Sequence, residues 1–144
     1  MQQQKSVFNN LVDFLESPLS SHIGVRLEYQ AYQEDRIQDL TQALSKCENL
    51  SYLDLDFEYK NIDDERITLL ADAILSCKNI STLQLNLMEN QFGAEALGQV
   101  LSDLINITQF ELLFNDIEFG DEGALEIGSG LSKMTSLTKL ALFI

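Results

Sequence analysis

The sequence predicts an α/β fold in which short strand–helix units stack side by side into a solenoid. The first observation is an internal repeat of about thirty residues that runs through most of the chain. The second is a change of apolar spacing within each repeat, from every second residue to every third or fourth. One such unit cannot bury both of its apolar faces, whereas stacked units share a continuous core. We therefore expect a parallel sheet on one side and helices on the other.

The repeat appears when residues 20–49 are placed on residues 50–79. Identical residues then coincide, as in Ser21/Ser51, Glu28/Glu58, Tyr29/Tyr59, Arg36/Arg66, Ile37/Ile67, Leu40/Leu70, Ala43/Ala73, Cys47/Cys77 and Asn49/Asn79. The apolar strand pattern begins at Leu50 and begins again at Ile80, Ile107 and Leu137, so that successive units have 30, 27 and 30 residues.

Each unit is expected to contain one strand and one helix. Alternating apolar residues predict five parallel strands, near residues 23–28, 53–58, 83–88, 110–115 and 140–143. The segments between them carry apolar residues at helical spacing, which predicts amphipathic helices. Asp63 and Asp121 stand where a carboxylate can accept hydrogen bonds from the free N–H groups that open a helix. Gly93 and Gly120 occupy the matching turns, where a wide range of backbone angles is useful.

The first eighteen residues lie outside the repeat. Their apolar residues form one helical stripe, which Ser17-Pro18 ends because the residue before a proline avoids the helical region. The stripe consists of Val7, Phe8, Leu11, Val12, Phe14 and Leu15. We expect residues 1–18 to form an N-terminal capping helix, and residues 19–144 to form about four repeat units and a final strand.

Two stretches carry a recognisable motif. Residues 83–90 read LxLxLxxN, which is close to the pattern LxxLxLxxN, and a Phe-Gly-x-Glu-Ala helix start follows up to residue 97; a similar helix start returns at residues 119–125. This motif resembles the ribonuclease-inhibitor type of leucine-rich repeat, and residues 44–50 look like the repeat junctions of such proteins in ciliated protists. The resemblance covers about residues 20–144. It implies an α/β leucine-rich-repeat solenoid, a horseshoe with the sheet on the concave side and the helices on the convex side.

The resemblance also implies function. Members of this family mostly bind proteins on the concave sheet, while one branch activates a small GTPase and another inhibits ribonucleases. The first unit departs from the family pattern, because residues 24–27 stand for its strand and the usual asparagine is absent.

The candidate binding residues are those that point away from the core. Side chains alternate along a strand, so the residues between the apolar ones face the concave surface. These outward residues are Arg26, Glu28, Asp54, Asp56, Glu58, Gln84, Asn86, Met88, Glu111, Leu113, Asn115 and Phe143. The acidic residues could receive Lys or Arg of a partner, and the apolar pair Leu113 and Phe143 favours a contact surface over a merely solvated face.

The charge of the chain narrows the classes of partner. The formal net charge is −14, which opposes binding to nucleic acid and to anionic lipid. This charge favours a basic protein partner; the alternative is that it only keeps the chain soluble. We expect no membrane-spanning segment and no secretory signal, since no apolar run is long enough. With only Cys47 and Cys77, a reducing cytoplasm is the expected compartment, with the cilium as a narrower possibility.

The residues predict no catalytic, cofactor or metal site. His22 is the only histidine and is expected to have a structural or surface role rather than a catalytic one, because neither cysteine is near it in sequence. Cys47 and Cys77 occupy one repeat position and are expected to be reduced and buried, each under the next unit. The acidic run at residues 63–65 lacks the spacing of a calcium loop, so helix-start charge explains it better.

The leading hypothesis is a non-enzymatic scaffold or adaptor, and the narrower form of this hypothesis is a subunit of a larger cytosolic or ciliary assembly. The alternatives are a GTPase-activating regulator of the same repeat class, for which the rim residues Tyr29, Gln30, Tyr32 and Gln33 match no motif, and an inhibitor of a basic enzyme. The strand at residues 137–144 has no helix after it in the sequence. We expect this edge to be covered by another chain or by further repeats, because an open strand edge exposes core residues.

Overall fold

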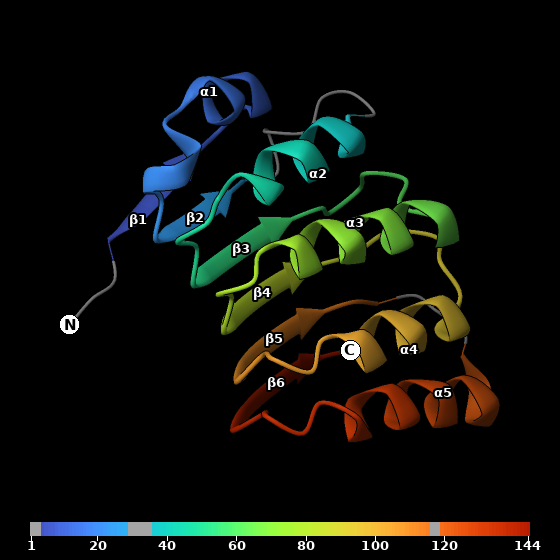
Figure 1. Ribbon diagram of the computed structural model, residues 1–144. Coiled ribbons are helices and arrows are strands. Elements are labelled where there is room, and N and C mark those ends of the chain that lie inside the picture. The colour runs from blue at the N-terminus through green and yellow to red at the C-terminus, as the bar shows by residue number, and fades with distance from the viewer. Residues whose placement is uncertain (1–3, 29–35, 116–118) are drawn as a thin grey trace.

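The computed structural model describes residues 4–28, 36–115 and 119–144, and its centre is one sheet of six parallel strands. The strands lie in the sheet in the order in which they occur along the chain (Figure 1). They are β1 (Lys5–Phe8), β2 (Gly24–Leu27), β3 (Tyr52–Asp56), β4 (Thr82–Asn86), β5 (Gln109–Leu113) and β6 (Lys139–Phe143). The chain is therefore an α/β protein, and the expected parallel strands are all present.

Helices connect the strands. Figure 1 shows α2 to α5 side by side along one side of the sheet, in chain order. The helices are α1 (Leu11–Glu16), the 3₁₀ turn η1 (Leu19–Ser21), α2 (Ile37–Ser45), α3 (Asp64–Ser76), α4 (Ala94–Asp103) and α5 (Gly120–Ser132). Parallel strands require such crossover connections, because a tight turn can join only antiparallel neighbours.

The core lies between the sheet and these helices. In β3, Leu53 and Leu55 are fully buried and alternate with half-buried polar residues, and β4 and β5 repeat the alternation. In α3 the buried residues include Ile67, Leu70 and Ile74, which recur at helical spacing. Each buried aliphatic side chain stabilises the fold by roughly 1.5–3 kcal/mol.

Backbone hydrogen bonds join each unit to the next in the same way. The carbonyl oxygen of Ile23 accepts from the N–H groups of both Ser51 and Tyr52. The oxygens of Ser51, Ser81 and Thr108 each accept two successive N–H groups of the following unit in the same manner. The amide of Asn79 adds a bond to Glu48 O at 2.7 Å. These hydrogen bonds hold the turn before each strand in the same position relative to the preceding unit.

Asn90 fills the turn that follows β4. Its Nδ2 donates to the carbonyl oxygens of Phe57, Leu87 and Met88, and its Oδ1 accepts from the N–H groups of Lys60 and Ile62. The side chain is buried and joins two successive turns. Asn90 ends the LxLxLxxN stretch of residues 83–90, and its hydrogen bonds clamp the backbone of two successive turns.

The N-terminal segment differs from the expected capping helix. Val7 and Phe8 lie in β1, which pairs with β2, and only Leu11–Glu16 is α-helical. The helical stripe predicted over residues 7–15 is therefore wrong in its first part. The aromatic ring of Phe8 packs edge-on against Phe14 and His22, so strand pairing and this aromatic cluster outweigh the local helical pattern.

The predicted helix caps are half right. Asp63 caps α3, because its side chain accepts a hydrogen bond from the N–H group of Arg66. Asp121 does not cap α5, since the helix begins one residue earlier, at Gly120, and Asp121 lies in its first turn. Gly120 has φ of 58°, which is the left-handed region that glycine tolerates best. The tight turn into α5 thus takes the place of a side-chain cap.

The two cysteines are free and buried, as predicted. The Sγ atom of Cys77 lies 3.4 Å from the carbonyl oxygen of Leu44, which belongs to the preceding helix. Cys77 therefore points back toward the unit before it rather than only under the next one. Burial raises the pKa of Cys47 to about 12 and that of Cys77 to about 11, so both thiols stay protonated at neutral pH.

Candidate functional site

The predicted binding residues come together on the sheet face opposite the helices, which we call the open face. Strand register places Arg26, Asp54, Gln84 and Glu111 in one row across four neighbouring strands. A second row runs through Asp56, Asn86, Leu113 and Phe143. The remaining predicted residues, Glu28, Glu58, Met88 and Asn115, lie just beyond the strand ends, because the strands stop earlier than expected.

Side chains in the first row are connected laterally. Arg26 lies 3.5 Å from both Asp54 and Glu28 in ion pairs. The hydroxyl of Tyr52 donates to Oε1 of Gln84, and Nε2 of Gln84 donates to Glu111 at 3.0 Å. The row therefore forms an almost continuous polar chain from β2 to β5, which holds its side chains in defined positions.

The second row and the strand ends are braced in a similar way. Nδ2 of Asn86 donates to Asp56 Oδ1 at 3.1 Å, and the same Asp56 oxygen accepts from the N–H group of Glu58. The side chain of Asn115 makes two hydrogen bonds with Glu89: its Oδ1 accepts from the backbone N–H group of Glu89, and its Nδ2 donates to Glu89 Oε1. These bonds restrict the rotamers of the acidic and amide side chains before any ligand arrives, which lowers the entropy cost of binding.

The open face becomes apolar toward β6. Leu113 and Phe143 are register partners on β5 and β6, and Ala141 lies beside Glu111. Phe143 is 54 % exposed, whereas Leu113 is half-buried rather than exposed as the sequence suggested. The face thus offers a polar, acidic region that reaches from β2 to Glu111 on β5, and an apolar pair, Leu113 and Phe143, at the carboxyl ends of β5 and β6.

Tyr52 and Lys5 belong to the open face and were not expected there. The ammonium group of Lys5 lies 3.7 Å from the centre of the Tyr52 ring, a cation–π contact. Register aligns Lys5 with Gly24 and Tyr52. The predicted strand began at residue 53, but β3 begins at Tyr52, and this one-residue difference is why Tyr52 was not listed among the outward residues. Lys5 was missed for another reason, since no sequence pattern predicted a strand at residues 5–8.

The electrostatics of the open face are dominated by carboxylates. Burial raises the pKa of Asp54, while the charges of Arg26 and Lys5 and the Tyr52 hydroxyl oppose that rise. The acids are Glu28, Asp54, Asp56, Glu58 and Glu111. Arg26 and Lys5 offset the acids near β2 and β3, Lys60 interacts with Asp56, and Lys139 lies on the same face in register with Gln109. The face therefore suits a ligand that brings positive charge.

The described residues provide no arrangement typical of catalysis. His22 and Ser17 are in contact, with Nε2 and Oγ 2.8 Å apart, but Ser17 Oγ also donates to the carbonyl oxygen of Phe14 at 2.6 Å. The serine proton is therefore engaged, and His22 serves as a donor rather than a base. No cluster of three or more His, Cys, Asp or Glu suited to a metal ion occurs within residues 4–28, 36–115 and 119–144.

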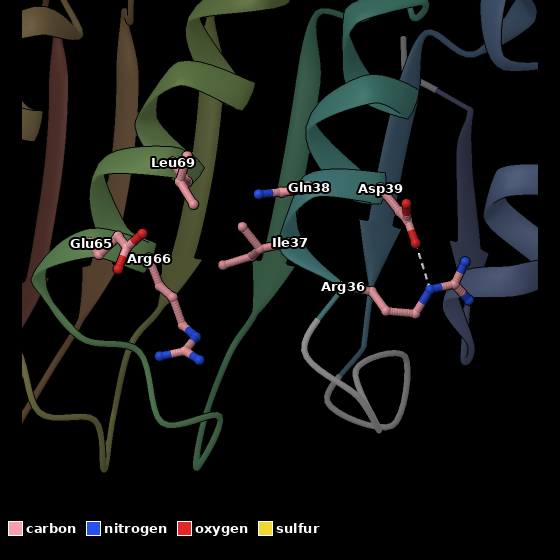
Figure 2. Close-up of a pocket in the computed structure, with 7 residues that line it drawn as sticks. All are labelled: Arg36, Ile37, Gln38, Asp39, Glu65, Arg66 and Leu69. Atoms are coloured by element: carbon pink, nitrogen blue, oxygen red, sulfur yellow. Dashed lines mark hydrogen bonds and ion pairs between the residues drawn. The ribbon is translucent and has the colours of Figure 1, made fainter.

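A surface hollow of about 420 Å³ lies on the helix side, where α2 and α3 begin. Figure 2 shows its lining, with Arg36 directed to Asp39 and Arg66 one unit further along. Each arginine forms an ion pair of 2.6 Å with a carboxylate of its own helix start, Arg36 with Asp39 and Arg66 with Asp63. The guanidinium groups are thus committed within the chain, and the hollow lies away from the open face.

No protein-family model matches this chain, and no curated protein is significantly similar to it in sequence. The fold itself defines a class: an α/β protein whose parallel strands alternate with helices. Among the residues with described positions, no helix is both long and apolar enough to cross a membrane. The rim residues Tyr29, Gln30, Tyr32 and Gln33 lie outside the described residues.

His22 provides a test of the N-terminal packing. It is 7 % exposed between the rings of Phe8 and Phe14, and burial lowers its pKa from the ordinary value of 6.5. The folded state therefore favours the neutral ring, so its contribution is complete above about pH 6.5 and decreases as the pH falls below that value.

We expect the free energy of unfolding in urea to decrease between pH 7.5 and pH 5 in both proteins. The decrease should be smaller for His22→Gln than for the natural chain, because glutamine has no proton to gain. Carboxylates titrate in both proteins, so their effects cancel in the comparison. An equal loss in the two proteins would show that His22 does not titrate on unfolding.

Proposed function

We propose that this protein is a leucine-rich-repeat scaffold that binds another protein on its open face, as a subunit of a larger cytosolic or ciliary assembly. The observation that supports this proposal is the braced polar row across β2 to β5, which ends beside the apolar pair Leu113 and Phe143. Preorganised polar groups next to an exposed aromatic ring are typical of protein-binding surfaces. The sequential parallel strands and the repeated unit contacts support the horseshoe arrangement.

The partner we propose is a basic protein segment that also brings an apolar group. Lys or Arg side chains would pair with Asp56, Glu58 and Glu111, and the apolar group would cover Phe143. Nucleic acid and anionic membrane are poor partners for a chain of net charge −14.

Two variants with matched controls test this surface. Immobilised natural chain is used to capture partners, which mass spectrometry then identifies, and each partner is assayed against the variants. We expect Glu111→Lys and Phe143→Ser each to weaken binding by about 1–2 kcal/mol, or roughly five- to thirtyfold. Glu95→Lys on α4 and Leu75→Ser on α3 make the same chemical changes on the helix side and should leave binding unchanged.

A partner that responds equally to both sets of variants would contradict the open-face proposal. Inhibition of a basic enzyme is the second candidate, because the acidic face could occupy a basic active-site cleft. Assays of a captured hydrolase with and without the chain distinguish inhibition from scaffolding. Acceleration of GTP hydrolysis by a captured GTPase would instead favour the regulatory alternative.

A further inference from the structure

The ring of Tyr52 is covered by a lysine from a strand that is not its neighbour. The Lys5 ammonium group lies 3.7 Å from the centre of the ring, and register places Gly24 of β2 between the two residues. Glycine brings no side chain to the open face, so the lysine can extend across β2. A Cβ atom on Gly24 would lie 3.4 Å from Lys5 Cγ, which shows that the lysine side chain runs directly over the glycine.

The missing side chain of Gly24 leaves a slot in the open face. Its two sides are β1 and β3, which lie roughly 10 Å apart because neighbouring parallel strands are about 4.8 Å apart. One wall is the Tyr52 ring, whose hydroxyl donates to Gln84 and lies 3.4 Å from Asp54 Oδ2. These two contacts hold the ring in a fixed orientation. The slot is therefore one side chain wide and has a preformed aromatic wall.

The chemistry of the slot suits a primary ammonium group. An aromatic face attracts a cation, and Asp54 places a carboxylate near the same ring. Burial raises the pKa of Asp54, and the charges of Arg26 and Lys5 oppose that rise, so the Lys5 ammonium interacts with this carboxylate as well. Lys5 is thus a ligand that the chain itself supplies, and it identifies the group that the slot accepts.

The Lys5 contact can be exchanged at small cost. β1 has only four residues, it pairs with β2, and Lys5 is exposed. Holding a lysine side chain in one conformation costs entropy of about the same size as the gain from an exposed cation–π contact. A lysine of a bound protein that enters the slot replaces one ammonium contact by an equivalent one, so little net free energy opposes the exchange.

We propose that the slot over Gly24 is a lysine-binding site of the open face, and that a lysine of the partner protein displaces Lys5 from the Tyr52 ring. This inference rests on the proposed function and deepens it, because it names the side chain that the partner brings to β2 and β3. It also gives the surface a built-in competitor, since Lys5 weakens the binding of any lysine from outside.

A short peptide with a single lysine tests the site. The probe is the acetylated and amidated pentapeptide Gly-Ser-Lys-Ser-Gly, and its binding is followed by NMR through the ring signals of labelled tyrosines. The signal that disappears in Tyr52→Phe identifies Tyr52. We expect Lys5→Ala to bind the peptide about fivefold more tightly than the natural chain, because the competing ammonium group is gone. The same peptide with Nε-acetylated lysine should not shift the Tyr52 signal, because its charge is lost.

Lys139→Ala is the matched control. It removes the same charge from the same row of the open face, but on β6, three strands away from Tyr52. It changes the general attraction of the face for cations and leaves the slot intact, so its effect should be much smaller than that of Lys5→Ala. Equal effects of the two variants, no effect of Lys5→Ala, or equal binding of the Nε-acetylated peptide would each overturn the proposal.

The captured partner separates this inference from the proposed function. If Glu111→Lys weakens partner binding but Lys5→Ala does not strengthen peptide binding, the lysine site is wrong and the open face remains the binding surface. If Lys5→Ala strengthens peptide binding as expected but partner binding is indifferent to Glu111→Lys, the lysine site is supported and the open-face scaffold is contradicted.

Discussion

Asn90→Ala is expected to destabilise the protein by about 3–5 kcal/mol, measured as the free energy of unfolding in urea. The side chain makes five hydrogen bonds to backbone groups of two successive turns and is 6 % exposed. Each bond contributes about 1 kcal/mol, and a backbone group left without its buried partner adds a desolvation cost. Alanine replaces none of these bonds, and water has little access to the site.

Asn79→Ala is the matched control, because it makes the same substitution at an asparagine with fewer contacts. Its amide makes one bond to Glu48 O, in an exposed turn, so its loss should cost only about 1 kcal/mol. Similar effects of the two variants would mean that Asn90 is not the backbone clamp that its contacts indicate.

The turn around Asn90 has an unusual backbone shape. Glu89 lies in the left-handed region with φ of 58°, and Tyr59, which occupies the equivalent position in the preceding unit, has φ of 56°. The clamp therefore holds a repeated and mildly strained backbone shape.

Cys77→Arg is expected to lower the free energy of unfolding by several kcal/mol, about 3–5. The thiol is 2 % exposed and packs between the helix end and Leu44 of the preceding unit. A guanidinium at this point would be buried without a partner, which is among the most costly changes a core can receive. Thermal or urea unfolding followed by circular dichroism measures the loss.

Cys77→Ala keeps the site neutral and should cost only about 1 kcal/mol. Comparable losses for arginine and alanine would show that the site opens to solvent. The natural thiols give an independent reading, because burial raises their pKa to about 11 and about 12. We expect a thiol reagent to modify them in the native protein only at the rate of unfolding, and rapid modification would contradict their burial.

Much of the fold could be predicted because its information is local and repeated. The alternation around Leu53 and Leu55, and the helical spacing around Ile67 and Ile74, are each visible within about ten residues. The same patterns return about thirty residues later, so a strand or helix that is ambiguous in one unit can be assigned from the equivalent residues of the next unit. The burial of Cys47 and Cys77 followed from the same argument, since they are one position seen twice.

The open face could be predicted only in part. Alternation identified Asp54, Gln84 and Glu111 as outward residues, and the structure places them in one row. It could not identify Tyr52 as the residue that connects the row, because that role depends on contact with Gln84 across the strands. The exposure of each outward side chain also depends on its neighbours in adjacent strands. Leu113, for example, is half-buried although its side chain lies on the open face.

The sequence by itself determined the class of fold, the parallel direction of the strands and the buried positions, because repeated apolar spacing admits few other ways of burying the same side chains. Only the tertiary structure decided that Val7 and Phe8 form a strand, since the pairing partner of β1 lies some twenty residues away in β2. It also decided the close approach of α4 and α5, because glycine permits many backbone arrangements and the packed neighbour selects one. Local patterns fix what each segment can be, and long-range contacts choose among the remaining possibilities.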